Sequence, residues 1–159
     1  KNDHVENLNK LFNKDSESVL YASKTEYFSK NRGIFYTSKT LSNNDIRSLL
    51  MWDNPIVHSS VAFRKKDYLK TKGYRKNYKY THDYALFIDL MRIGKLSFSD
   101  KVSVEYYVYE NSLSHKEPKK CLLERFNNQW KALFLFGFTD IFHSLKVFPI
   151  LFLRSLIRK

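Results

Sequence analysis

The chain has 159 residues, a formal net charge of +12 from 28 Lys and Arg against 16 Asp and Glu, and a hydrophobic content of 43%. This composition excludes a disordered polyelectrolyte, because such chains hold too few apolar residues to bury a core. A single cysteine, Cys121, excludes a disulfide-stabilised scaffold and predicts a reducing compartment. No apolar segment follows Lys1, so the sequence predicts no secretory signal, and the missing initial Met predicts a piece of a longer protein.

The first third of the sequence predicts a helix, a strand and a hairpin. Val5, Leu8 and Phe12 recur at helical spacing and predict a helix near the N-terminus. The apolar run at residues 19–22 predicts a short buried strand. Segments 26–28 and 33–36 flank a turn-like sequence that ends in Gly33, so we expect a hairpin in which Gly33 adopts positive φ.

The middle of the sequence predicts two short helices and a strand between them. One of Asn43, Asn44 and Asp45 is expected to cap a helix that ends before Pro55. Residues 56–64 alternate in polarity and therefore predict a strand. The basic segment 65–72 predicts a short helix that Gly73 ends.

A helix and the clearest strand of the sequence follow. Residues 82–93 predict a helix that Thr81 caps and Gly94 ends. Its expected buried residues are Leu86, Phe87, Leu90 and Ile93. Residues 102–109 alternate strictly, with apolar residues on both faces, and predict a strand between two layers.

The C-terminal part of the sequence predicts an amphipathic helical tail. Pro118 suits the first turn of a helix. The expected apolar face of this helix consists of Leu122, Leu123, Phe126, Trp130 and Leu133. The longest uncharged stretches, 132–139 and 147–153, are far shorter than the roughly 20 residues of a spanning helix. The tail is therefore expected to pack on the domain or to lie on a membrane surface.

Four polar or basic clusters are candidates for function, and each also has a purely structural interpretation. Residues 54–60 and 107–115 are typical of turns, and Asp83 in the first turn of a helix interacts favourably with the helix dipole. The basic run 64–79, which includes Arg64, Lys65 and Lys66, is a candidate phosphate or membrane contact or a solvated helix. No zinc spacing, phosphate-binding glycine loop or covalent nucleophile motif is present in the sequence.

Taken in order, these segments resemble the C-terminal half of family 2 glycosyltransferases, which are inverting enzymes with the GT-A fold. The resemblance depends on Asn54-Pro55-Ile56-Val57-His58-Ser59-Ser60, Phe63-Arg64-Lys65, Gly73-Tyr74, His82-Asp83-Tyr84-Ala85-Leu86, Gly94-Lys95 and the segment from Tyr106 to Ser114. It implies an α/β chain that is a partial, Rossmann-like GT-A domain without its N-terminal nucleotide-binding half. Residues 1–116 would be the acceptor-side part of that domain, and residues 117–159 the helical tail.

The resemblance also implies which residues act. Asp83 corresponds to the family's catalytic base, which takes the proton from the acceptor hydroxyl. The residues expected near the acceptor or the metal are His58, His82, Tyr109, Glu110, Asn111, Ser114 and His115. In two places the sequence departs from the family, since His82 replaces a Glu and Tyr109 replaces a His.

The resemblance further implies a divalent cation, Mg²⁺ or Mn²⁺, for the complete enzyme. The family's Asp-x-Asp motif, which supplies most of the coordination, does not occur in this sequence, so no cation is expected to bind this chain alone. The metal ligands therefore stay unknown, and the isolated chain is expected to be inactive.

The expected function is transfer of a sugar from a nucleotide-sugar to a polysaccharide or glycolipid acceptor with inversion. The expected partners are the donor, a glycan or lipid-linked acceptor and the missing N-terminal half of the domain, with no nucleic acid. The expected location is the cytoplasmic face of a bacterial cell membrane. The alternative is a non-enzymatic basic module that binds an anionic membrane surface or polyanion through residues 64–79 and the tail.

Overall fold

The computed structural model describes residues 3–109 and 116–157, and their side chains as far as residue 137. Its centre is a four-stranded mixed sheet built on β1 (Ser18–Ser29). β4 (Lys95–Tyr107) runs parallel to β1 along one side. On the other side β2 (Gly33–Thr37) and β3 (Val61–Phe63) pair antiparallel with the two ends of β1. The α/β class that the sequence predicts is confirmed.

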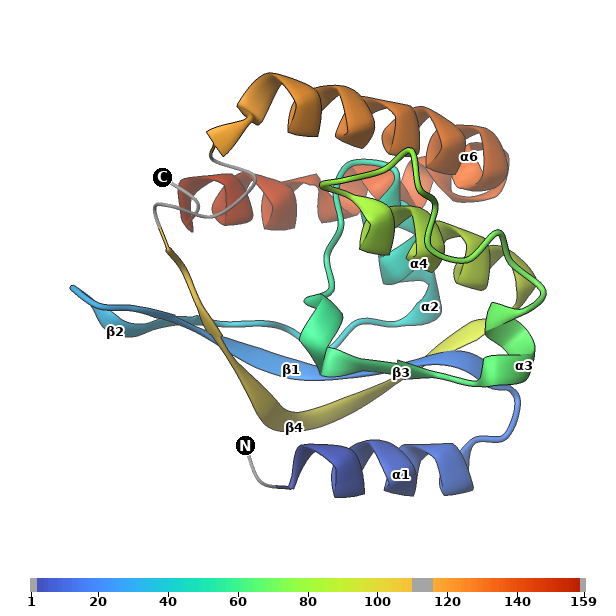
Figure 1. The fold of residues 1–159 in the computed structure, drawn as a ribbon, viewed down its shortest axis with the longest axis horizontal. Coiled ribbons are helices and arrows are strands. Elements are labelled where there is room, and N and C mark those ends of the chain that lie inside the picture. The colour runs from blue at the N-terminus through green and yellow to red at the C-terminus, as the bar shows by residue number, and fades with distance from the viewer. Residues whose placement is uncertain (1–2, 110–115, 158–159) are drawn as a thin grey trace.

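Helices cover both faces of this sheet (Figure 1). α1 (His4–Lys14) lies on one face, and α4 (His82–Ile93) and α2 (Asn43–Leu50) lie on the other, with α6 (Pro118–Ile157) beyond them. The main core forms between β1 and the second helical layer. Its fully buried side chains include Leu20, Ala22, Ile46, Leu50, Leu86, Phe87 and Leu90. Burying each large apolar side chain stabilises the fold by roughly 1.5–3 kcal/mol.

The predicted hairpin is confirmed, but its first strand is longer than expected. The segments at 19–22 and 26–28 belong to one continuous strand, β1. β1 and β2 are joined by a turn in which Gly33 has a φ of +64°. Only glycine adopts this left-handed conformation without steric cost, which explains its place at the end of the turn.

The predicted cap of α2 is wrong by one residue. Ser42 is the N-cap, because its Oγ accepts a hydrogen bond from the Asp45 amide at 3.2 Å and the Asp45 carboxylate accepts one from the Ser42 amide at 2.9 Å. This reciprocal pair is a capping box. Asn43 lies inside the helix and instead accepts a hydrogen bond from the amide of Leu96 in β4.

The strand predicted over 56–64 is wrong for most of its length. Residues His58–Ser60 form a 3₁₀ turn, η1, and only Val61–Phe63 pair with β1 as β3. The hydroxyl of Ser60 donates to the Val57 carbonyl at 2.7 Å, and the Ser60 amide donates to the same oxygen. Such local bonds compete with strand pairing. The following helix, α3 (Lys65–Tyr68), is also shorter than predicted.

The helix predicted over 82–93 is confirmed as α4, and the strand predicted over 102–109 forms part of β4. β4 already begins at Lys95, directly after Gly94, and ends at Tyr107. Thr81 occupies the N-cap position of α4, but its side chain makes no capping hydrogen bond. Its hydroxyl donates to Glu124 of α6 instead.

α6 begins at Pro118 as predicted, and its predicted apolar face is largely exposed. Leu122, Phe126 and Trp130 are 63%, 52% and 57% exposed. The buried face consists of Asn128, Ala132 and Phe136, because this side of the helix packs towards α2 and α4. In the described part of the chain, no helix has the length and apolar character that crossing a membrane requires.

Candidate functional site

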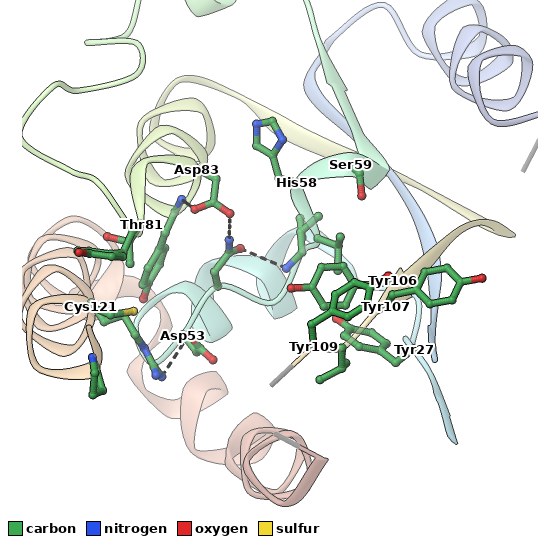
Figure 2. Close-up of a pocket in the computed structure, with 18 of the residues that line it drawn as sticks. Tyr27, Asp53, His58, Ser59, Thr81, Asp83, Tyr106, Tyr107, Tyr109 and Cys121 are labelled. Carbon is green, nitrogen blue, oxygen red and sulfur yellow. Dashed lines mark hydrogen bonds and ion pairs between the residues drawn. The ribbon is translucent and has the colours of Figure 1, made fainter. Parts of the chain in front are cut away.

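A cleft of about 970 Å³ opens at the carboxyl ends of the parallel strands β1 and β4 (Figure 2). Its walls come from the loop and turn at residues 53–59, the first turn of α4, the end of β4 and the first turns of α6. Binding pockets for small molecules have volumes of roughly 300–1,000 Å³. In open α/β sheets, ligands bind outside the carboxyl ends of the strands, so this cleft is the candidate site.

Asp83 presents its carboxylate to this cleft from the first turn of α4 (Figure 2). Its Oδ2 accepts a hydrogen bond from Nδ2 of Asn54 at 3.0 Å, and its Oδ1 accepts one from the amide of Tyr84 at 2.8 Å. Each carboxylate oxygen has about two lone-pair sites, so both can accept a further proton donor from the cleft. The positive end of the helix dipole also favours an acid at this position.

Asn54 fixes the orientation of the Asp83 carboxylate. Its Oδ1 accepts a hydrogen bond from the amide of Ile56 at 3.2 Å, which leaves its Nδ2 to donate to Asp83. Asn54 heads the motif at residues 54–60 but is missing from the predicted site. The sequence gives no local signal for this contact, because the two residues are 29 positions apart.

The N-terminus of α4 is held in place by α6. The carboxylate of Glu124 accepts hydrogen bonds from the amides of Lys79, Tyr80 and Thr81 at 2.8, 2.8 and 3.0 Å. Asn128, which is fully buried, donates to the hydroxyl of Thr81 at 3.0 Å. These contacts fix the backbone two residues before Asp83, so α6 positions the turn that contains Asp83.

His58 and His82 meet in an aromatic cluster beside Asp83. The Nε2 of His58 is 2.7 Å from the hydroxyl of Tyr74, and the two histidine rings lie 6.3 Å apart between centroids. Burial raises the pKa of Tyr74, and the neighbouring Tyr68 and Asp83 groups raise it further. His58 lines the cleft, whereas His82 lies against Tyr74 outside its lining.

Five tyrosines form the wall of the cleft on the sheet side. This tyrosine wall consists of Tyr27, Tyr36, Tyr106, Tyr107 and Tyr109. Neighbouring rings contact each other, with centroid distances of 5.3 Å for Tyr27 and Tyr36, 5.4 Å for Tyr27 and Tyr106, and 6.2 Å for Tyr107 and Tyr109. The sequence prediction included Tyr109 alone. The signal for the others is the run of tyrosines at the ends of the strands.

The other predicted site residues either lie outside the described residues or are absent from the described lining of the cleft. Glu110, Asn111, Ser114 and His115 lie outside the described residues. The guanidinium of Arg64 donates to the Phe12 carbonyl at 3.0 Å and to the Tyr21 hydroxyl at 2.9 Å, so it is used in packing between α1 and β1. Lys65 and Lys66 are exposed on α3 and do not line the cleft.

The described residues do not make up a site for the divalent cation that the resemblance implies. Within the described part of the chain, no three His, Cys, Asp or Glu side chains gather at metal-binding distance. The cleft lining contains two carboxylates, Asp83 and Asp53, and Asp53 pairs with Arg125 at 3.4 Å. No catalytic step is therefore assigned to a metal here.

The cleft thus combines an oriented carboxylate with an aromatic wall. The carboxylate can take a proton from a bound hydroxyl, and the aromatic wall can stack against the apolar face of a ring-shaped ligand. Comparison with protein-family models and with curated proteins finds no match for the chain. Its function has to be inferred from the residues of the cleft together with the resemblance in the sequence.

Proposed function

We propose that the chain forms the acceptor side of an inverting family 2 glycosyltransferase of the GT-A type, with Asp83 as the catalytic base. The observation that supports this most is the orientation of Asp83. Its carboxylate lines the cleft, and Asn54 holds it by a 3.0 Å hydrogen bond. The position of the cleft, at the carboxyl ends of β1 and β4, is where α/β enzymes bind their ligands.

In the proposed reaction a hydroxyl of the acceptor donates its proton to Asp83. The hydroxyl oxygen forms a bond to the anomeric carbon of the nucleotide-sugar while the bond from that carbon to the diphosphate breaks. The diphosphate leaves with the electron pair, and attack from the opposite face inverts the anomeric centre. General base catalysis by a positioned carboxylate contributes roughly 10²–10⁴-fold in rate.

The tyrosine wall supports a carbohydrate acceptor. A sugar ring has an apolar C–H face and polar hydroxyls at its edge, and tyrosine offers an apolar ring with a polar end. Tyr107 and Tyr109 lie nearly parallel, with an interplanar angle of 21°, and are 45% and 65% exposed. These two exposed rings can therefore stack against the sugar rings of an oligosaccharide bound in the cleft.

Binding of the nucleotide-sugar donor and of a divalent cation is implied by the resemblance alone. The leaving diphosphate would need charge stabilisation, which a divalent cation supplies in this family. The described side chains offer no ligand set for that cation, so donor binding is not assigned to residues of this chain.

The alternative, a basic module that binds polyanions, has less support. Two arginines of the run at 64–79 are used inside the fold. Arg64 bonds to Phe12 and Tyr21, and Arg75 donates to the buried Asp89 at 2.7 Å. Lys70 pairs with the buried Asp67 at 2.8 Å. The run therefore presents fewer available cations than its sequence implies.

The stereochemistry of the product tests this proposal. The protein, expressed from its complete natural reading frame, is incubated with nucleotide-sugars and a lipid and glycan extract of its own source. We expect a new glycoside whose anomeric configuration, measured by NMR, is opposite to that of the donor. Retention of configuration, or no transfer from any nucleotide-sugar, would overturn it.

A further inference from the structure

The first half of α6 has an exposed apolar face. We call this face the apolar stripe. It consists of Leu122, Leu123, Phe126, Trp130, Leu133 and Phe134. Their exposed fractions range from 39% to 79%. Single exposed apolar residues are ordinary, but a contiguous group of this kind marks an interaction surface.

The spacing of these residues places them on one side of the helix. Positions three and four apart, such as Leu122, Phe126 and Trp130, lie above one another along a helix. The opposite side contains Asn128, Ala132 and Phe136, which are buried. α6 therefore packs on the domain through one face and presents the apolar stripe outward.

Charges beside the apolar stripe are positive. Residues 118–137 contain one acid, Glu124, and its carboxylate is turned inward to the amides of Lys79, Tyr80 and Thr81. Lys119 and Lys120 at the start of the helix are exposed, and Lys120 also pairs with Glu117. The whole chain has a formal charge of +12. An apolar face bordered by lysine on a basic protein is complementary to an anionic lipid surface.

We infer that the apolar stripe docks the protein on an anionic bilayer, with α6 lying in the plane of the interface. Phe126 and Trp130 contact each other edge to face, with centroids 5.8 Å apart, and form the centre of the stripe. Tryptophan favours the headgroup region, because its ring is apolar and its N–H donates a hydrogen bond. A second copy of the chain is a poorer occupant, since it would bring two strongly positive surfaces together.

Docking in this way would bring the cleft to the membrane. Leu122 belongs to the apolar stripe and also lines the cleft, together with Pro118 and Cys121 of the same helix turns. The opening of the cleft therefore adjoins the face that meets the lipid. The inference does not depend on sugar transfer, because it follows from the exposed face and its charges alone.

Vesicle binding of the 159-residue chain tests the inference. The chain contains two tryptophans, so Trp52→Phe leaves Trp130 as the only one. With vesicles of phosphatidylcholine and phosphatidylglycerol we expect a blue shift of Trp130 emission, weaker with phosphatidylcholine alone and reduced by salt. No shift with anionic vesicles would overturn the inference.

A paired variant gives a second measurement. Phe126→Ala with Trp130→Ala should lower partition into anionic vesicles by at least about tenfold. The control is Leu69→Ala, which removes an equally exposed apolar side chain from another part of the surface and should leave partition unchanged. Unchanged partition of the paired variant would overturn the inference. So would light scattering that shows a dimer in the unaltered chain and a monomer in the paired variant.

Discussion

The side-chain amide of Asn54 donates a 3.0 Å hydrogen bond to Oδ2 of Asp83 and ties the loop before η1 to the first turn of α4. The carbonyl oxygen of the same side chain accepts a hydrogen bond from Ile56. Because both ends of the Asn54 amide are used, it has one favourable orientation, and the Asp83 carboxylate is held in one orientation with it. In the proposed reaction this bond aims the base at the acceptor.

Replacing Asn54 should therefore reduce turnover more than binding. In the protein expressed from its complete natural reading frame, we expect Asn54→Ala to lower kcat for sugar transfer about tenfold and to change KM for the acceptor little, because misdirecting a base affects the chemical step. Steady-state kinetics with varied acceptor measure both. Asn127→Ala, which truncates an exposed Asn of α6, is the control. A rise in KM without a fall in kcat would show that Asn54 binds the acceptor rather than positioning Asp83.

Two adjacent asparagines of α6 should differ sharply in their effect on stability. Asn128 is fully buried and donates to the Thr81 hydroxyl at 3.0 Å, whereas Asn127 is exposed. Asn128→Ala should lower the free energy of unfolding by about 1–3 kcal/mol, because Thr81 loses a buried partner. Asn127→Ala should stay within about 0.5 kcal/mol. Urea denaturation of both variants checks this, and equal midpoints would contradict it.

Local sequence patterns predicted the elements whose signals are local. The turn at Gly33, the helix from His82 to Ile93 and the start of α6 at Pro118 each depend on residues within a few positions. The prediction of a strand over 56–64 failed because the Ser60 hydroxyl donates back to the Val57 carbonyl. Alternating polarity does not reveal such a bond. Such side-chain to backbone bonds compete with sheet pairing wherever Ser or Thr occurs.

The candidate site was predicted only in part, for a different reason. Asp83 and His58 come from recognisable motifs and both line the cleft. Tyr27 and Asn54 join the site through long-range packing, which one sequence does not encode locally. The spacing of apolar residues identified the apolar side of α6 but not which side of the helix packs on the domain. Asn128, a polar residue, is buried there through its bonds to Thr81.

The buried hydroxyl of Tyr84 should make the fold sensitive to alkali. Burial, together with the charge of Asp53, raises the pKa of Tyr84 above its ordinary value of 10.0. The unfolded chain therefore releases this proton at lower pH than the folded chain. The protonated Tyr84 hydroxyl therefore contributes fully to the free energy of unfolding below about pH 10, and this contribution is lost as the pH rises above 10.

Tyr84→Phe should remove that sensitivity. At neutral pH the free energy of unfolding of the variant should be lower by about 1–2 kcal/mol, because the hydrogen bond from the Tyr84 hydroxyl to the Leu50 carbonyl is missing. Its stability should then fall less steeply in alkali than that of the unaltered protein. Urea denaturation at neutral and alkaline pH measures the difference, with Asn128→Ala as a control of similar stability loss. If the free energy of unfolding of Tyr84→Phe fell as steeply in alkali as that of the unaltered protein, Tyr84 would not be the source of the alkaline sensitivity.

The close approach of Gly94 to Val19 should not tolerate a side chain. A Cβ at Gly94 would lie 2.9 Å from Cγ2 of Val19 and closer still to Cγ1, where β4 begins beside β1. Gly94→Ala should therefore lower the free energy of unfolding by about 1–3 kcal/mol, because the added methyl group overpacks this contact. Combined with Val19→Ala, it should cost less than the sum of the two single changes. Additive losses in thermal or urea unfolding would contradict the proposed clash.

The central claim is that Asp83 is the base, and the initial rate of sugar transfer by Asp83→Asn, made in the protein expressed from its complete natural reading frame, tests it most directly. Asparagine preserves the size of the side chain but cannot accept the proton, so we expect a fall of at least about 10²-fold with unchanged acceptor affinity. The free energy of unfolding should fall by no more than about 1 kcal/mol, because the helix dipole no longer meets an acid. Asp100→Asn, which alters an acid on the exposed part of β4, is the matched control and should transfer sugar normally. Transfer by Asp83→Asn within about threefold of the unaltered rate would contradict the account.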